Sequence, residues 1–128
     1  MILLVTGGSG CGKSFWAERV MARLPGPRVY LATMACADEE SRRRVARHRA
    51  QRAHLDFETV ERPTDLGGVR IPPEAAVLLE DLPNLLANEM FAGGDPGRIA
   101  PQLEALADCV AEVVYSVPVA VRGVLPCV

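Results

Sequence analysis

Short apolar runs alternate along this chain with segments whose apolar residues recur at helical spacing. The runs end at glycines, prolines or acidic residues and are short enough to be buried strands. The predicted strands are Ile2–Val5, Val29–Ala32, Phe57–Val60, Ala75–Leu79 and Val113–Val121, the last interrupted by Pro118. The predicted helices are Ser14–Leu24, Asp38 to about His54, Leu82–Phe91 and Ile99 to about Ala111. This alternation predicts an α/β layer fold with a mainly parallel sheet.

The boundaries of these elements carry their own signals. Pro25-Gly26-Pro27 stops the first helix, and Pro63–Pro73 and the glycine-rich Ala92–Gly97 read as turns and loops. Asp81 is placed to cap the helix Leu82–Phe91, which has a proline in its first turn. Because no linker, repeat or low-complexity tract interrupts the chain, we expect a single domain over residues 1–128.

Composition excludes several classes of protein. With 49% hydrophobic and 23% charged residues, the chain has ordinary globular usage, which argues against disorder and fibrous repeats. A formal charge of −2 and 5% aromatic residues argue against nucleic acid or an anionic membrane as partner. No apolar run reaches the ~18 residues of a membrane span. The first residues lack the basic region of a signal peptide. The four cysteines, Cys11, Cys36, Cys109 and Cys127, show no metal-ligand spacing, so we expect reduced thiols and a cytoplasmic location.

The chain has thirteen arginines and a single lysine, Lys13. A mutational bias toward arginine would explain this ratio, and under such a bias the retained lysine marks a site that needs a compact point charge. Lys13 falls in the run Gly7-Gly8-Ser9-Gly10-Cys11-Gly12-Lys13-Ser14, which matches G-x-x-x-x-G-K-[ST]. In such a loop backbone amides cradle phosphate, the lysine reaches the β- and γ-phosphates, and the hydroxyl of Ser14 can ligate Mg²⁺. The strand before this motif and the helix after it favour nucleotide binding over a chance glycine-rich turn.

A phosphate loop works with an acidic residue at the end of a neighbouring strand, which holds Mg²⁺ directly or through water. Glu80 and Asp81 follow the apolar run Ala76–Leu79 and meet this requirement. Asp81 could serve only as a helix cap and Glu80 only as a solvated residue at the strand end. We favour Glu80 on the metal and Asp81 as the cap.

The helix predicted over Asp38–His54 begins with three acids and continues with six arginines around His48. Helical geometry places residues 42, 45, 49 and 52 on one face and 44, 48 and 51 on another. A solvated helix is the ordinary interpretation of such a charge run. Beside a nucleotide, however, a neutral imidazole can attack phosphorus while guanidinium groups neutralise the transferring phosphate. His54 lies six residues from His48, on a different side of the helix, so a shared metal site is not expected.

Several of these residues occur in the order and spacing of a known family. Residues 1–91 resemble the bifunctional adenosylcobinamide kinase/adenosylcobinamide-phosphate guanylyltransferase family of cobalamin biosynthesis. The resemblance rests on Val-Thr-Gly-Gly before Gly-Lys-Ser, Tyr30-Leu31-Ala32-Thr33, Arg44-x-x-x-His48-Arg49, Glu58-Thr59-Val60-Glu61, Leu78-Leu79-Glu80, and Asn88 followed by Phe91. The resemblance implies a P-loop NTPase-like three-layer fold.

The family resemblance also implies two reactions and a set of site residues. A nucleoside triphosphate, ATP or GTP, phosphorylates adenosylcobinamide, and GTP then guanylylates a histidine that passes GMP to adenosylcobinamide phosphate. By position, His48 would accept GMP, and Gly7 to Ser14 would hold the triphosphate, with Lys13 as a catalytic group. The other implied contacts to nucleotide are Ala32, Thr33, Met34, Arg49, Ala50, Gln51, Arg52, Glu61 and Glu80, with Ser14 and Glu80 on Mg²⁺. Family members form trimers, which implies a homotrimer here.

The chain also departs from the family pattern. Gly10-Cys11 stands where many members have Arg-Ser. A Val-Thr-Asn-Glu-Val-Gly-like motif expected in the last third is absent, although Ala107–Val114 and Val117–Gly123 resemble the family's final strand. An internal deletion of one strand–helix unit, with its junction near Leu106 or near Val114, would explain this, and an incomplete sheet would expose apolar edges. Two alternatives to the bifunctional enzyme therefore stay open: a small-molecule kinase without guanylyl transfer, and a nucleotide-binding protein without catalysis.

Overall fold

The computed structural model describes residues 3–35, 38–91, 97, 99, 109–114 and 117–125. The chain divides into two compact units, residues 1–24 with 97–128 and residues 25–96. The prediction of a single domain stays a prediction.

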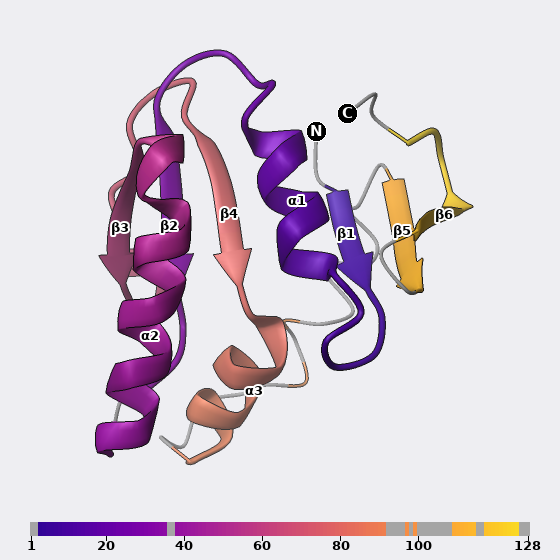
Figure 1. The fold of residues 1–128 in the computed structure, drawn as a ribbon. Coiled ribbons are helices and arrows are strands. Elements are labelled where there is room, and N and C mark those ends of the chain that lie inside the picture. Colours follow the sequence, from indigo (N-terminus) through magenta and orange to yellow (C-terminus); the bar gives the residue numbers. More distant parts are fainter. Residues whose placement is uncertain are drawn as a thin grey trace. The chain divides into compact units, whose positions relative to one another are not determined.

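The first unit contains strand β1 (Leu3–Thr6), helix α1 (Lys13–Met21), strand β5 (Cys109–Val114) and strand β6 (Val117–Arg122). β1 pairs in parallel with β5, from Leu3 opposite Cys109 to Thr6 opposite Glu112, and β5 pairs antiparallel with β6 (Figure 1). The core of this unit is formed by Trp16, Val20 and Val113. Leu3, Val5, Cys11 and Leu125 pack against it. The buried face of α1 therefore fixes the helix that follows the glycine-rich loop.

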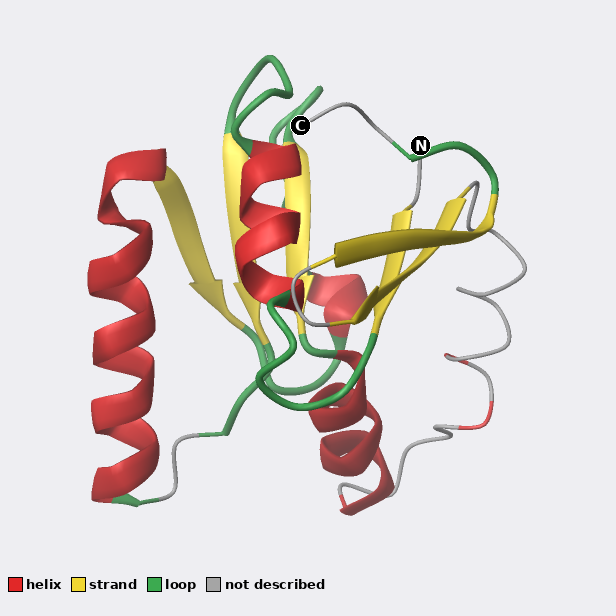
Figure 2. Ribbon diagram, turned by 45° about the vertical axis from the view of Figure 1, so that its right-hand side comes forward, coloured by secondary structure: helices red, strands yellow, loops and turns green. Residues whose placement is uncertain are grey.

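The second unit contains β2 (Arg28–Ala32), α2 (Glu39–Arg52), the 3-10 turn η1 (Ala53–Leu55), β3 (Phe57–Glu61), the 3-10 turn η2 (Leu66–Gly68), β4 (Ala76–Glu80) and α3 (Leu82–Phe91). Its three strands are all parallel, in the order β3-β2-β4. Figure 2 shows α2 turning back through a short connection into β3, which runs in the opposite direction. The carboxyl ends of all three strands therefore lie at one edge, where α3 follows β4 (Figure 1).

Register divides the residues of this sheet between two faces. Tyr30 lies opposite Thr59 and Leu78, and Ala32 lies opposite Glu61 and Glu80. Since side chains alternate along a strand, these residues share one face. Val29 and Leu31 lie on the other face and are 1% and 4% exposed. The face of Val29 and Leu31 is thus mainly apolar, with Glu58 opposite Val29, and the other face carries a tyrosine, a threonine and two glutamates.

The α/β class with a mainly parallel sheet is confirmed. The predicted helix Leu82–Phe91 has the observed bounds, and the other predicted elements up to residue 80 agree within a few residues. Asp38 and Asp81 cap α2 and α3, because each carboxylate accepts a hydrogen bond from the amide three residues on, at Ser41 and Asn84.

Two predictions for the last third were wrong in part. Residues 109–111 belong to β5 and not to the end of a helix Ile99–Ala111, because Val113 is fully buried against the core and β5 pairs with β1 over its first four residues. The run Val113–Val121 is divided between two antiparallel strands. Pro118 is accommodated because β6 is paired only with β5 among the described residues, so its missing N–H is tolerated. Residues 92–96 of the predicted loop, residues 100–108 of the predicted helix and the deletion junction near Leu106 lie outside the described residues. The missing strand–helix unit stays a prediction.

Candidate functional site

The glycine-rich loop joins β1 to α1 in the first unit. Gly12, with φ 94°, directly precedes the first residue of α1, and Gly7 has φ 141°. A Cβ added to Gly7 would lie 2.4 Å from the carbonyl oxygen of Val113 and 2.8 Å from Cys11 Sγ. The first glycine of the motif is therefore required by a close approach of β5 as well as by its backbone angle.

Lys13 folds its side chain across this loop. Its Nζ donates hydrogen bonds to the carbonyl oxygens of Gly7 at 2.8 Å and Gly8 at 2.6 Å. Lys13 is also the first residue of α1, and Ser14 the second. The ammonium group, the hydroxyl of Ser14 and the amino-terminal end of α1 consequently gather at one loop, which is an arrangement suited to phosphate.

In the second unit, α2 covers the polar face of the sheet. Arg52 is the only buried side chain of α2 and is 4% exposed. Its guanidinium carbon lies 3.4 Å from the centroid of the Tyr30 ring, a close cation–π contact, and Nη1 has no hydrogen-bond partner among the described residues. A helix held over a sheet by a buried arginine instead of an apolar stripe leaves space beneath it.

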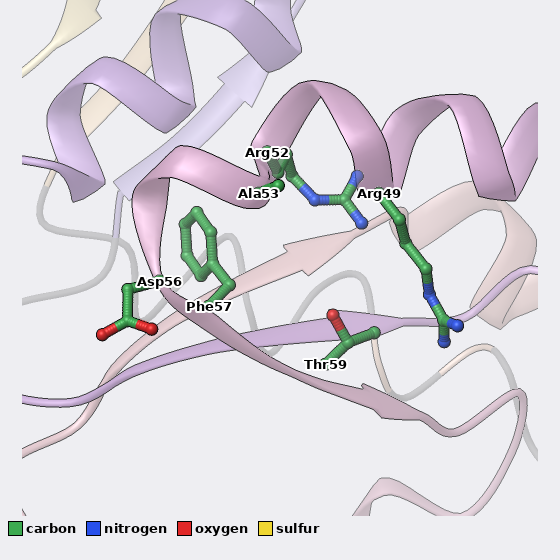
Figure 3. Close-up of a pocket in the computed structure, with 6 residues that line it drawn as sticks. All are labelled: Arg49, Arg52, Ala53, Asp56, Phe57 and Thr59. Carbon is green, nitrogen blue, oxygen red and sulfur yellow. The ribbon is translucent and has the colours of Figure 1, made fainter.

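Two hollows lie beneath and beside α2. The larger has a volume of about 380 Å³ and is lined by Arg49, Arg52, Ala53, Asp56, Phe57 and Thr59 (Figure 3). Figure 3 shows the arginine side chains extending from α2 on the side of Thr59, with Phe57 and Asp56 toward the other end. The smaller, of about 60 Å³, is lined by Tyr30, Ala32, Met34, Arg44, Val45, His48, Arg49, Arg52, Thr59, Glu80, Asp81 and Asn84. Arg49, Arg52 and Thr59 belong to both linings, so the two hollows adjoin.

Basic and acidic side chains both line the smaller hollow. His48 and three arginines enter from α2, whereas Glu80 and Asp81 enter from the end of β4. Arg49 Nη2 lies 2.5 Å from Glu61 Oε1. Glu80 Oε2 accepts a short hydrogen bond from the hydroxyl of Tyr30. This is a basic hollow whose acidic groups are fixed at its sheet side.

Glu80 is held in place by a network at the carboxyl ends of β2 and β4. Thr33, fully buried, donates from Oγ1 to the carbonyl oxygen of Asp81 at 2.7 Å and accepts from the Asp81 amide at 2.8 Å. The amide of Thr33 donates to the carbonyl oxygen of Glu80. Asn88 Nδ2 donates to the carbonyl oxygens of Thr33 and Pro63. The network joins two strands, the loop after β3 and α3.

Most of the predicted nucleotide contacts of the second unit come together. His48, Arg49, Arg52, Ala32, Met34 and Glu80 line one hollow. Glu61 pairs with Arg49 at its rim, while the Thr33 hydroxyl is occupied by the backbone of Asp81. Ala50 and Gln51 are exposed and belong to neither lining. Ala32 and Glu80 are the last residues of two strands that only the sheet brings together, and Met34 follows the first of these strands.

The arginine-rich helix α2 is partly a solvated helix and partly the wall of a basic hollow, so each interpretation of its charge run holds for one part of it. Arg42 and Arg43 form ion pairs with Glu39 in solvent. Residues 44, 48, 49 and 52 line the hollow, so both of the helical faces predicted from the sequence contribute residues to it. The pKa of Asp38, at the start of the helix, is lowered from 3.8 by hydrogen bonding from Ser41. The first turns of α2 are thus solvated and the last turns line the site.

Tyr30 and Thr59 line the smaller hollow but were not predicted as site residues. Both belong to segments that resemble the family, and the alternation of side chains along a strand could have placed them at the site. Tyr30 is two residues before Ala32, and Thr59 is two before Glu61, so each pair shares a face once the strand is placed. Asn84, one turn into α3, carried no such signal.

The donors available to a magnesium ion are oxygen atoms. The hydroxyl of Ser14 in the first unit and the carboxylate of Glu80 in the second are each oxygen donors of the kind that Mg²⁺ takes. Among the described residues, no cluster of three histidine, cysteine or acidic side chains could hold a metal by itself. No helix within the described ranges is long and apolar enough to cross a membrane.

A glycine-rich phosphate loop and a basic, histidine-containing hollow on a parallel sheet define an α/β protein of the P-loop class. A family model described as cobinamide kinase / cobinamide phosphate guanyltransferase matches residues 3–122, and the chain belongs to this family.

Three relatives are similar to the chain. The bifunctional adenosylcobalamin biosynthesis protein CobP of Pseudomonas aeruginosa is 38% identical over 112 residues, 85% of this chain and 64% of the relative. The proteins CobU of Salmonella typhimurium and Escherichia coli, described by the same words, are 35% and 36% identical over 96 and 99 residues. These two alignments cover 73% and 74% of this chain, and 52% and 54% of the relatives. The chain thus spans between about half and two thirds of the length of the curated relatives it matches.

Proposed function

We propose that the chain phosphorylates adenosylcobinamide and transfers GMP from GTP to adenosylcobinamide phosphate, through a guanylylated His48, in cobalamin biosynthesis. The observation that carries the proposal is the lining of the smaller hollow. His48 stands there with Arg44, Arg49 and Arg52 on the helix side and Glu80 on the sheet side. A nucleophile surrounded by guanidinium groups is suited to attack on a phosphate ester.

In the proposed guanylyl transfer, a nitrogen lone pair of the His48 imidazole forms a bond to the α-phosphorus of GTP. The bond from this phosphorus to the bridging oxygen breaks, and pyrophosphate leaves with the electron pair. An oxygen of adenosylcobinamide phosphate then attacks the same phosphorus, the phosphorus–nitrogen bond breaks, and adenosylcobinamide-GDP forms. Arg52, whose Nη1 has no partner, can donate to a phosphate oxygen throughout.

In the proposed kinase step, the hydroxyl oxygen of adenosylcobinamide forms a bond to the γ-phosphorus of ATP or GTP. The bond from this phosphorus to the bridging oxygen breaks, the nucleoside diphosphate leaves with the electron pair, and the hydroxyl proton passes to water. The phosphate loop supports this step through the backbone amides of Gly7 to Ser14 and the ammonium group of Lys13. A magnesium ion, when bound with nucleotide, would neutralise phosphate charge and would be held by Ser14 and Glu80. The hydrogen bond that the Glu80 carboxylate accepts from the hydroxyl of Tyr30 supports this part of the proposal.

Incubation with GTP labelled at the α-phosphate tests the guanylyl transfer. We expect acid-labile covalent label on the unmodified chain and none on His48→Ala. His54→Ala is the matched control, because His54 is exposed on η1 and lines neither hollow. It should retain the label. Label that persists in His48→Ala, or its absence from the unmodified chain, would contradict the proposed transfer.

A parallel incubation with γ-labelled ATP or GTP and adenosylcobinamide separates the alternatives. Label transferred to the corrinoid without label on the protein would indicate a kinase alone, and nucleotide binding without either product would indicate a non-catalytic protein. Lys13→Ala should abolish transfer to the corrinoid.

The proposal includes a homotrimer, as the family resemblance implies, and a cytoplasmic location. Light scattering on the purified chain tests the assembly, and a mass of three chains is expected.

A further inference from the structure

Tyr30 occupies a position between a buried cation and an acidic group. Its side chain is 5% exposed at the centre of the sheet, and the edge of its ring meets Phe57, with centroids 6.0 Å apart and ring planes at 76°. The ring face lies under the guanidinium group of Arg52, and the hydroxyl donates to Glu80. One side chain thus contacts two groups of opposite charge that line the same hollow.

Without an intervening group, a carboxylate and a guanidinium group in one hollow would pair with each other. Such a pair would be charge-assisted and geometrically favourable. Tyr30 opposes this pairing at both ends, because its ring covers one face of Arg52 and its hydroxyl binds Oε2 of Glu80. The unpartnered Nη1 of Arg52 is consistent with this separation.

We infer that Tyr30 is a positioning residue that keeps Arg52 and Glu80 apart, so that both remain available to a nucleotide phosphate and its counter-ion. The inference rests on the proposed function for the identity of the ligand. Removal of the hydroxyl would take away the bond that opposes pairing of Glu80 with Arg52, and that pairing would withdraw the cation from the ligand.

The inference predicts a rescue. Tyr30→Phe retains the ring, its contact with Phe57 and its place under Arg52, but loses the hydroxyl. In EDTA, we expect Tyr30→Phe to bind GMP about tenfold more weakly than the unmodified chain, as for the loss of one hydrogen bond to a charged group. The double variant Tyr30→Phe/Glu80→Gln should bind GMP within about twofold of the unmodified chain, because a neutral amide does not form the competing ion pair.

GMP is the probe because it carries only the phosphate that the proposed reaction places at His48, and EDTA removes any contribution of Glu80 through a metal. Equilibrium dialysis with labelled GMP gives the dissociation constant for each variant. Val29→Ala is the structural control. Val29 is 1% exposed on the opposite face of the same strand, so this variant should lower the melting temperature without weakening GMP binding.

Three outcomes would overturn the inference. These are unchanged GMP binding in Tyr30→Phe, equal weakening in the single and double variants, and no GMP binding by the unmodified chain. A chain that binds GMP as described but takes no label from GTP would contradict the proposed transfer and leave the role of Tyr30 supported. If the unmodified chain takes label from GTP but Tyr30→Phe binds GMP normally, the proposed transfer would be supported and the role of Tyr30 contradicted.

Discussion

Thr33 offers the most direct test of how the strand ends are held together. Thr33→Val preserves shape and removes only the hydroxyl, which is fully buried and bonds both the amide and the carbonyl oxygen of Asp81. At about 0.5–1.5 kcal/mol for each bond, the variant should lose about 1–3 kcal/mol of unfolding free energy. The Asp81 carbonyl oxygen keeps its bond from the Leu85 amide, so its amide is the group left unsatisfied.

Urea unfolding followed by circular dichroism measures this loss. With a slope of about 1–3 kcal/mol per molar urea, the midpoint should fall by about 1 M while the slope is unchanged. Thr59→Val makes the same chemical change on the neighbouring strand, at a hydroxyl for which the structure gives no hydrogen bond to a described residue, and should alter stability by less than about 0.5 kcal/mol. Thr33→Ser should retain most of the stability. Equal stability of Thr33→Val and the unmodified chain would refute the network.

Two further predictions concern the ends of α1 and α2. Gly7→Ala should lower the melting temperature and abolish GTP binding, because its Cβ would lie 2.4 Å from a backbone oxygen. In Gly8→Ala, where a Cβ meets nothing within 4 Å, the melting temperature should be unchanged, and equal effects of the two variants on it would contradict the close approach. Asp38→Ala should reduce the helicity of α2 at pH 7, whereas Asp38→Asn, which can still cap, should retain it. Because hydrogen bonding from Ser41 lowers the pKa of Asp38, its stabilisation is complete above pH 3.8 and is lost as the pH falls below that value. Helicity measured from pH 5 to pH 2 should fall less in Asp38→Asn, and parallel curves would argue against the cap.

The sequence alone determined the local elements and the chemistry they carry. The phosphate loop was predicted because its glycines, Lys13 and Ser14 are contiguous, and the caps Asp38 and Asp81 because each acts on an amide three residues away. His48 and its arginines belong to one helix, so their spacing could be read directly. Interactions within one turn or one loop depend on short stretches of chain, which is why pattern and propensity suffice for them.

Only the tertiary structure decided which of these groups meet. The strand order β3-β2-β4 and its register place Tyr30, Thr59 and Glu80 on the face that α2 covers. Nothing in local sequence indicates that Arg52 is buried on a tyrosine or that the Thr33 hydroxyl binds Asp81, because these contacts join residues 22 and 48 positions apart. The end of the predicted helix Ile99–Ala111 was wrong for the same reason. Burial of Val113 and pairing with β1 outweigh the helical pattern, and both depend on residues about a hundred positions away.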